Sequence, residues 1–317
     1  MRNNFKFKVN KENYLLGRII IIILSLVLIG LIIYLGTNYI RDIKYTGERI
    51  LENSDTKNEV LVKDKFPTTP YVNYEEGTGI IEYGSPTMTI TIEPVVKTNP
   101  NLQMWISTIK VKSADQINSA FAGDEFSLNI KERTSDIAKR HEAIFAVNGS
   151  AYGFNKSSYV IRDGIIYRDS GLDFAPLIIK ENGDFVIYDY EELKGEAMLK
   201  LGAKHTYDFG PDLIKDGKMT RWATHEEFYK DNRAPRTAIG QLDTLEYVVI
   251  VADGRSNESV GMTFNELALE FQRLGCKWAY NLDGGGSTTL YFNGEVLNNP
   301  SDWNGERKIS DILYFSN

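Results

Sequence analysis

Apolar and polar residues alternate along much of the chain, and this pattern predicts a strand-rich domain. Thr87–Glu93 alternates as a half-buried strand does, and Leu102–Val111 shows the same two-residue period. Asn, Asp and Gly tolerate the positive φ that tight turns require, so turns are predicted at Asp163-Gly164, Asn182-Gly183 and Asp216-Gly217. Short strands joined by turns are therefore expected.

One helix is predicted with clear start and stop signals. Thr263-Phe264-Asn265-Glu266 matches the capping box that satisfies free amides at a helix start, which gives Glu266 a structural role. One apolar face follows, and Gly275 ends the helix. The residues of this face are Phe264, Leu267, Ala268, Phe271 and Leu274.

This helix connects two apolar runs, Tyr247–Ala252 and Trp278–Leu282. A strand–helix–strand unit of this kind has parallel strands as its natural geometry. Asp253 and Asp283 follow the two runs, so they are expected at the same edge of the sheet. Ligands collect beyond the carboxyl ends of such strands, and this edge is where chemistry is expected.

The N-terminal region contains a segment suited to a membrane. Residues 19–40 carry no charge, and Ile19–Leu35 are nearly all Ile, Leu and Val. At about 1.5 Å per residue, such a helix spans a hydrocarbon core of about 30 Å. Five of the six charged residues before it are basic, which predicts that this end stays in the cytoplasm. Gly36-Thr37-Asn38-Tyr39 offers no good signal-peptidase site, so an uncleaved, single-pass anchor in the cell membrane is predicted.

These patterns divide the chain into four parts. We predict a cytoplasmic basic tail over residues 1–17, a transmembrane anchor over 18–37, a polar extracytoplasmic stalk over 38–76 and a folded domain over 77–317. The predicted fold class is α+β, a strand-rich mixed sheet with a few packed helices, preceded by one N-terminal transmembrane helix.

Composition excludes several classes of function. The net charge of -7 and the pI near 5.2 argue against a nucleic-acid partner, which would need a basic face. A single cysteine, Cys276, forms no internal disulfide, and it is expected to be buried. The three histidines lie far apart and give little support to zinc hydrolysis. No cofactor is expected; a calcium ion on Asp253, Asp283 or Asp302 stays open, although the spacing fits no EF-hand loop.

The most informative stretch is Asp283 followed by three glycines, Ser287 and Thr288. Successive glycines allow a sharp turn and let a ligand approach the main-chain amides. Amides and hydroxyls together form a concave anion site, suited to phosphate or to charge developing on oxygen. A glycine-rich bend between strands is the alternative. The nucleotide P-loop is excluded because it needs a lysine after the glycines, whereas Leu290-Tyr291-Phe292 here is typical of a strand.

Two arginines and one loop complete the candidate site. Arg236 lies in Pro235–Gly240 and Arg255 in Asp253-Gly254-Arg255, and guanidinium groups pair well with phosphate oxygens. Asn148-Gly149 follows the apolar run Ala143–Val147 and is typical of a strand end that opens into a ligand loop. Ser150 is not in a nucleophile elbow, so a serine-hydrolase interpretation is weak.

In order along the chain, these residues resemble the phosphodiester glycosidase domain family, which includes the mammalian uncovering enzyme of lysosomal targeting and bacterial exopolysaccharide-associated proteins. The resemblance covers roughly residues 80–317. One departure is that Ser150-Ala151-Tyr152 follow Asn148-Gly149, where the family usually has a second glycine and aromatics. This departure bears on the shape of the loop and on the sugar preference. The matching motifs are Asn148-Gly149, Phe209–Gly217, Pro235–Gly240, Asp253-Gly254-Arg255, Gly261-Met262-Thr263, Asn281–Thr289 and Asn299–Asp302.

The resemblance implies hydrolysis of an α-linked sugar-1-phosphodiester on a cell-envelope glycan or glycopolymer. Because phosphate is a good leaving group, the reaction needs anion stabilisation and a carboxylate that activates water or attacks the anomeric carbon. The catalytic candidates are Asp283, Asp253 and Arg236. The substrate-binding candidates are Asn148, Gly149, Thr237, Arg255, Asn281, Gly284, Gly285, Gly286, Ser287 and Thr288. Two alternatives remain: a catalytically silent saccharide-binding or exopolysaccharide-assembly protein, and a phosphodiesterase that attacks phosphorus.

Overall fold

The computed structural model describes residues 66–317 except 171–173, 189–193 and 225–231. The described residues belong to a compact unit that spans Phe66–Asn317. The predicted basic tail, the anchor and residues 38–65 of the predicted stalk lie outside the described residues. Within the part that is described, no helix has the length and apolar character needed to cross a bilayer.

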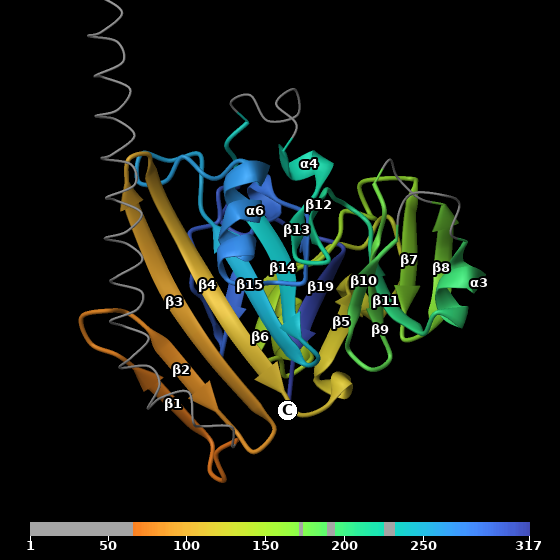
Figure 1. Cartoon of the computed structure of the whole chain (residues 1–317), viewed down its shortest axis with the longest axis horizontal. Helices are drawn as coiled ribbons and strands as arrows, with labels where there is room; N and C mark the ends of the chain where they lie inside the picture. The colour runs from red at the N-terminus through yellow and green to blue at the C-terminus, as the bar shows by residue number, and fades with distance from the viewer. Residues whose placement is uncertain (1–65, 171–173, 189–193, 225–231) are drawn as a thin grey trace, which may run out of the picture. The chain divides into compact units, whose positions relative to one another are not determined.

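The largest sheet of the described residues has nine strands (Figure 1). The alternation predicted for Thr87–Glu93 and Leu102–Val111 is confirmed, because both segments are strands of this sheet. Residues 71–74, placed in the stalk by the sequence analysis, form its first strand and pair with the second. In spatial order the strands are β1 (Tyr71–Tyr74), β2 (Ile81–Gly84), β3 (Met88–Thr98), β4 (Asn101–Val111), β15 (Glu246–Ala252), β14 (Arg236–Asp243), β16 (Trp278–Asn281), β12 (Asp212–Lys215) and β13 (Lys218–Met219).

Three smaller sheets accompany it. The five-stranded sheet contains β18 (Glu295–Val296), β17 (Leu290–Phe292), β6 (Phe145–Asn148), β19 (Asp311–Phe315) and β5 (Ile117–Phe121) in that order. The three-stranded sheet contains β10 (Phe185–Ile187), β9 (Leu177–Lys180) and β11 (Ala203–Tyr207), and β7 (Ser158–Arg162) pairs with β8 (Ile165–Ser170). The three predicted turn dipeptides are confirmed, since they join β7 to β8, β9 to β10 and β12 to β13 with positive φ at their glycines.

Helices are few and short in the described residues. They are α2 (Thr134–Arg140), α3 (Gly195–Lys200), α4 (Arg221–Thr224) and α6 (Phe264–Arg273), together with 3₁₀ turns at Ala114–Gln116, Ala122–Asp124 and Gly285–Ser287. The predicted start of α6 is confirmed, because Thr263 and Glu266 make both capping-box hydrogen bonds. Gly275 follows the helix with φ +82°. The strand-rich α+β architecture with few helices is as predicted.

The layers follow from where apolar side chains gather. The largest core cluster lies between the nine-stranded and five-stranded sheets and includes Ile239, Tyr280, Phe145 and Leu313. A second cluster packs α6 on the opposite face of the nine-stranded sheet, and a third packs α2 on the outer face of the five-stranded sheet. Figure 1 shows α6 across β14 and β15, with β5, β6 and β19 behind them. The two central sheets thus lie between two helical layers.

The predicted strand–helix–strand unit needs one refinement. The strands β15 and β16 run parallel, as expected, but β14 lies between them and pairs antiparallel with both. Every ladder recorded among the described residues is antiparallel. Since β14 runs the opposite way, its first residue, Arg236, lies at the edge where β15 and β16 end.

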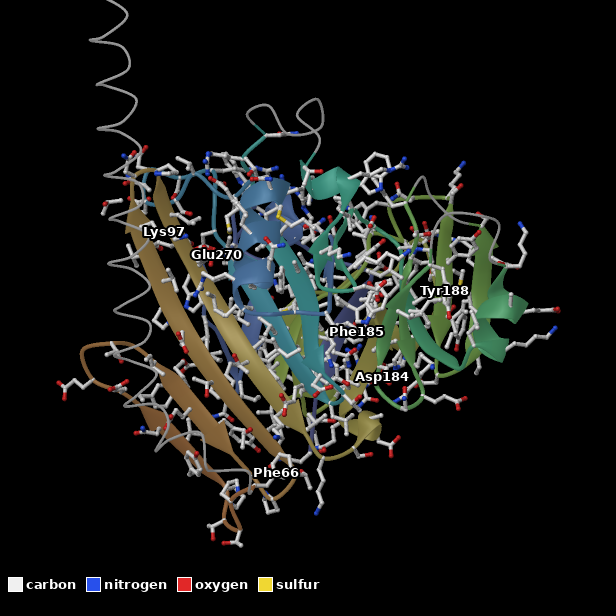
Figure 2. The ribbon with its side chains drawn as sticks, in the orientation of Figure 1. Phe66, Lys97, Asp184, Phe185, Tyr188 and Glu270 are labelled. Atoms are coloured by element: carbon white, nitrogen blue, oxygen red, sulfur yellow. The ribbon has the colours of Figure 1, made fainter. Side chains whose placement is uncertain are left out.

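An ion pair on the outer face, Lys97 Nζ to Glu270 Oε1 at 2.6 Å, links β3 to α6 (Figure 2).

A buried ion pair lies where β7 meets β19. Arg162 is 3% exposed and Asp311 is fully buried, and the two side chains are directly paired. Arg162 also donates to the carbonyls of Ile161 and Thr206, and its guanidinium lies 4.5 Å from the ring centroid of Tyr207. Charges buried in this way need a partner, because desolvation penalises each of them. The pair therefore holds β7 against the five-stranded sheet.

Removing one partner of this pair should destabilise the fold. In Asp311→Asn, the Arg162 charge stays buried without a counter-ion, and we expect the free energy of unfolding to fall by about 3–5 kcal/mol. Urea unfolding followed by circular dichroism measures this change. The matched control is Asp243→Asn, which breaks the exposed Lys277–Asp243 pair at 2.9 Å and should leave the transition in place. An equal effect of the two substitutions would contradict the assignment.

Candidate functional site

The predicted site residues meet at one edge of the nine-stranded sheet. Asp253 follows β15 and Asp283 follows Leu282 after β16, while Arg236 begins β14 between them and pairs in register with Ala252. The end of β6 reaches the same place, because the amide of Asp283 donates to the carbonyl of Gly149 at 3.2 Å. Four segments that are distant in sequence therefore converge here.

Asn148 joins these segments through its side chain. It is fully buried, and its Nδ2 donates to the carbonyl of Asp283 at 2.6 Å. Its Oδ1 accepts from Thr237 Oγ1 at 2.8 Å and from the amide of Thr289 at 3.2 Å. The sequence analysis assigned Asn148 and Thr237 to substrate binding. In the structure their side chains bond to each other, and Asn148 also bonds to the loop after β16, so the pair positions that loop.

The glycine loop uses most of its amides within the protein. Gly285 N donates to Pro235 O at 2.9 Å, Ser287 N to Gly284 O at 3.2 Å, and Thr288 N to Gly285 O at 3.3 Å. The Thr288 side chain is buried, and its hydroxyl finds no partner among the described residues. An anion at this loop would therefore depend on neighbouring cations more than on a cradle of free amides.

Two arginines explain why glycines are needed. A Cβ at Gly285 would lie 2.9 Å from Arg255 Nη2, and a Cβ at Gly286 would overlap the guanidinium of Arg307. At Gly284 a Cβ would lie 2.9 Å from the carbonyl oxygen of Pro235. The glycines thus let two cationic side chains lie directly against the loop that follows Asp283.

Asp283 is a buried carboxylate with only 9% of its surface exposed. Burial raises the pKa of this carboxyl group above its ordinary value, while Ser287, the amide of Gly284 and the charge of Arg307 oppose the shift. The charge of Asp311 adds to the increase. A carboxylate with a raised pKa is a better base than one in water, which suits the role predicted for it.

Asp253 has a structural set of partners. Its side chain is 4% exposed and accepts hydrogen bonds from Asn298 Nδ2 at 3.0 Å and from the amide of Asn299 at 3.1 Å. Burial raises the pKa of Asp253, and these two donors oppose the shift. Its carbonyl accepts from Ser259 at 2.7 Å. The carboxylate therefore holds the 298–299 segment beside the glycine loop.

Arg236 is a buried cation held by carbonyl groups. It donates to Met262 O at 3.0 Å and to Asn232 O at 2.8 Å, and it lies 3.8 Å from the ring centroid of Phe264. Burial, and then the charge of Arg255, lowers the pKa of Arg236 to about 10, so it stays charged at neutral pH. Among the described residues it forms no ion pair with a carboxylate. The Met262 and Asn232 carbonyls and the Phe264 ring thus hold the guanidinium of Arg236, and it is the charge of Arg307 that lowers the pKa of Asp283.

Several other predicted residues pack or cap. A Cβ at Gly149 would meet Asp311 Oδ1 at 2.7 Å, which explains the glycine. The side chain of Asn281 donates to Gly210 O at 2.6 Å and to Leu282 O at 2.9 Å, which fixes the end of β16. Glu266 caps α6 and pairs with Arg233 at 2.5 Å. Cys276 is buried as expected, and burial raises its pKa to about 12.

No metal cluster is found in the part of the chain that the structure describes, where no three His, Cys, Asp or Glu side chains converge. The aspartates considered for calcium have other partners: Asp253 binds Asn298 and Asn299, and Asp302 Oδ1 lies 3.5 Å from Arg307.

Sequence reasoning missed Arg307. It follows Asn304-Gly305-Glu306 in a polar stretch near the C-terminus, where no periodicity or motif distinguishes it from a surface residue. Its charge acts on Asp283, and its guanidinium occupies the space beside Gly286. The signal available in the sequence was indirect: three glycines in a row indicate that some bulky group lies against the backbone there.

A pocket of about 280 Å³ lies away from this site. It is lined by Lys180, Gln241, Asp243, Lys277 and Trp278, together with Asp184 and Phe185, which are labelled in Figure 2. Gln241 and Asp243 lie at the end of β14 and Trp278 begins β16, opposite to the ends that carry Arg236 and Asp283, while Lys180 and Phe185 belong to β9 and β10. The pocket therefore includes none of the predicted site residues.

Comparison with known proteins identifies the class. The chain belongs to the phosphodiester glycosidase family, whose family model matches residues 141–316, a range that includes the whole site described above. Over 292 residues the chain is 30% identical to the SPbeta prophage-derived uncharacterized protein YomE of Bacillus subtilis (strain 168). The match covers 86% of this chain and 43% of that protein, so the chain spans less than half the length of this relative.

Two solved structures share the fold. The zebrafish N-acetylglucosamine-1-phosphodiester alpha-N-acetylglucosaminidase catalytic domain, auto-inhibited by its pro-peptide, is 21% identical with a TM-score of 0.59. That match covers 81% of this chain and 92% of the zebrafish chain. A hypothetical protein from Synechocystis is 15% identical with a TM-score of 0.50, covering 78% of this chain and 68% of that one.

The two aspartates should respond differently to substitution. Burial raises the pKa of Asp283 in the folded protein above its value in the unfolded chain. Between these two pKa values the folded protein holds a proton on Asp283 that the unfolded chain has lost. The free energy of unfolding therefore falls as the pH rises through this window, from the lower pKa to the higher one. Above the window Asp283→Asn removes a buried charge. We expect it to melt at or above the wild-type temperature at neutral pH, with a difference that shrinks toward about pH 4.

Asp253→Ala is the comparison. It leaves the donors of Asn298 and Asn299 without their acceptor, and we expect it to lower the free energy of unfolding by about 1–3 kcal/mol. Thermal melts of the wild type and both variants across a pH series measure these effects. A clearly lower melting temperature for Asp283→Asn at neutral pH would show that its carboxylate is structural.

Proposed function

We propose that this chain hydrolyses a sugar-1-phosphodiester, releasing a free sugar and a phosphomonoester, on a cell-envelope glycan or glycopolymer. The observation that carries the proposal is the buried carboxylate of Asp283 beside a glycine loop against which Arg255 and Arg307 lie. Membership of the phosphodiester glycosidase family supports the reaction class.

The charges suit cleavage of the bond between the anomeric carbon and oxygen. As this bond breaks, negative charge grows on the departing phosphate oxygen, and positive charge grows on the sugar ring. Arg255 and Arg307 neutralise the phosphate, with the buried charge of Arg236 behind them. Asp283 stabilises the ring and either attacks the anomeric carbon or takes a proton from water. If Asp283 attacks, water then cleaves the glycosyl–Asp283 bond and restores the carboxylate. In both routes the water oxygen and one of its protons become the hydroxyl of the free sugar, and the other proton passes to solvent or to the phosphate, through Asp283 where Asp283 acts as the base.

One carboxylate is enough for this chemistry. Ordinary glycosidases use a second carboxylic acid to protonate a poor leaving group. A phosphomonoester leaves readily without that proton, so anion stabilisation takes the place of the general acid. The nearby acid whose charge acts on Asp283 is Asp311, and it is committed to Arg162. The site is therefore suited to a phosphate leaving group more than to an alcohol.

The product of hydrolysis tests the proposal directly. The first probe is an α-N-acetylglucosamine-1-phosphodiester with a methyl group on the phosphate, chosen from the sugar that the zebrafish protein's name gives. In ¹⁸O-labelled water we expect the label in the free sugar, because the carbon–oxygen bond breaks. Label in the phosphate, with release of sugar-1-phosphate, would show attack on phosphorus instead.

Variants assign the roles. Asp283→Asn should abolish sugar release, and Arg307→Lys or Arg255→Lys should lower turnover by about 100–1000-fold, because an ammonium cannot reproduce the paired hydrogen bonds of a guanidinium. Arg273→Lys, an exposed arginine paired with Glu270 on α6, is the matched control and should keep full activity. An active and well-folded Asp283→Asn protein would overturn the assignment. Binding of a panel of sugar-1-phosphodiesters without turnover of any would favour the saccharide-binding alternative.

We also propose that residues 18–37 hold the domain at the outer face of the cell membrane. The uncharged segment and its basic N-terminal flank support this placement. A polymer substrate of the envelope would then be within reach of the site.

Protease treatment of intact cells tests this orientation. Protease should digest the region after residue 37, whereas a tag placed at the N-terminus should stay protected until the cells are permeabilised. A cytoplasmic protein serves as the control for lysis. Protection of the folded domain in intact cells would contradict the proposed orientation.

A further inference from the structure

Trp303 is the most exposed of the large hydrophobic side chains in the described residues, with 95% of its surface in solvent. A single exposed apolar side chain is ordinary on a protein surface, so exposure alone indicates nothing. What distinguishes Trp303 is that the segment carrying it is fastened to the candidate site on both sides.

The tryptophan projects from a tight turn. The amide of Gly305 donates to the carbonyl of Asp302 at 3.1 Å, which places Trp303 at the first central position. Gly305 has φ +83°, a conformation that glycine adopts without strain. The turn therefore fixes the direction of the backbone from which the indole ring extends.

The flanks of this turn contact the glycine loop. On the N-terminal side, the amide of Asn299 bonds to Asp253, and Ser301 Oγ donates to Gly285 O at 3.4 Å. On the C-terminal side, Arg307 lies against Gly286 and 3.5 Å from Asp302.

A further bond fixes the C-terminal flank to α2. Glu306 accepts from the amide and hydroxyl of Ser135, at 2.9 Å and 2.5 Å. The turn is thus pre-organised at the rim of the site, so binding of a ligand there would cost little conformational entropy.

We propose that Trp303 is a stacking platform for a second sugar ring, attached to the phosphate on the side opposite the scissile sugar. The inference rests on the proposed function, and it assigns Trp303 to the part of the substrate that lies beyond the phosphate. The apolar C–H face of a pyranose packs on an indole ring while its hydroxyl groups stay in water, so such a platform is exposed until substrate arrives. Arg307, next to the platform, would bind the phosphate that connects the two rings.

Binding of two probes to the full chain tests the platform apart from catalysis. One probe joins two N-acetylglucosamine rings through an anomeric phosphodiester, and the other replaces the second ring with methyl. In an Asp283→Asn background, Trp303→Ala should raise the Kd of the two-ring probe about tenfold, which is ~1.4 kcal/mol, and change that of the methyl probe by less than about twofold. Trp303→Phe should keep most of the affinity, because phenylalanine retains a flat apolar face.

The control is Tyr74→Ala, which removes an aromatic side chain that is 60% exposed on β1, and it should affect neither probe. Equal binding of both probes to Trp303→Ala and to its parent would overturn the platform while sugar release by the wild type still supports the proposed function. Conversely, Trp303-dependent binding without hydrolysis by the wild type would overturn the proposed function and leave the platform standing. An equal loss for the two probes would show that Trp303 acts only on the structure of the rim.

Discussion

The buried carboxamide of Asn148 is the interaction on which the arrangement of the site depends. It lies at the end of β6 in the five-stranded sheet, and it bonds to Thr237 on β14 of the nine-stranded sheet. It also bonds to both ends of the loop that contains the three glycines, at the carbonyl of Asp283 and the amide of Thr289. A buried amide has to satisfy its donors and acceptor, and here it does so only when the two sheets are in register. The packing of the two sheets and the position of the catalytic candidate are therefore fixed by the same side chain.

The loop held in this way combines a carboxylate that burial makes costly with cations that compensate for it. Without Arg307 the ionised form of Asp283 would be less stable still. Arg307 lies close to Asp283 because Gly286 has no side chain in the space that the guanidinium occupies. The other buried acid close to Asp283 is Asp311, and its charge is balanced by Arg162. Asp311 therefore does not compete with Asp283 for Arg307. Strong electrostatic effects at low solvent exposure require such pairing, since an unbalanced buried charge would unfold the region around it.

Local patterns predicted the elements that obey local rules. The alternation in β3 and β4, the capping box of α6 and the turn dipeptides all depend on neighbours within a few residues, and all were confirmed. The strand β14 was not predicted, because its first six residues are buried on both faces and show no alternation. Its place between β15 and β16 brings Arg236 to the edge of the sheet. The sequence pattern could not predict this position, because it depends on the order of the strands in the sheet.

The roles of individual site residues were harder to predict for the same reason. Asn148 was expected to bind substrate because it follows an apolar run at a strand end, and that role stays a prediction. Its contacts with the loop could not be predicted, because these partners lie 89 to 141 positions away in the sequence. Arg307 has no sequence pattern at all, and only the fold places it beside the glycines. The glycines were interpreted as giving a ligand access to main-chain amides, and the structure adds that Gly285 and Gly286 make room for the guanidinium groups of Arg255 and Arg307. Long-range contacts decided each of these roles.

The difference between amides and arginines has a consequence for the proposed reaction. A phosphodiester carries one negative charge, and the phosphomonoester that leaves carries a second. Cleavage is therefore favoured by hydrogen-bond donors whose interaction with the phosphate strengthens most as this charge grows, and guanidinium groups are such donors. Mobile guanidinium groups at a partly exposed rim can move with the departing phosphate, whereas amides fixed in a 3₁₀ turn cannot. The side chain of Arg307 is 36% exposed, and its neighbour Asp302 is 37% exposed. In the proposed reaction, this exposure would let Arg307 exchange its contact with Asp302 for one with the departing phosphate. Asp283, in contrast, is buried and contacts the loop, so the candidate site combines one enclosed carboxylate with a partly exposed arginine.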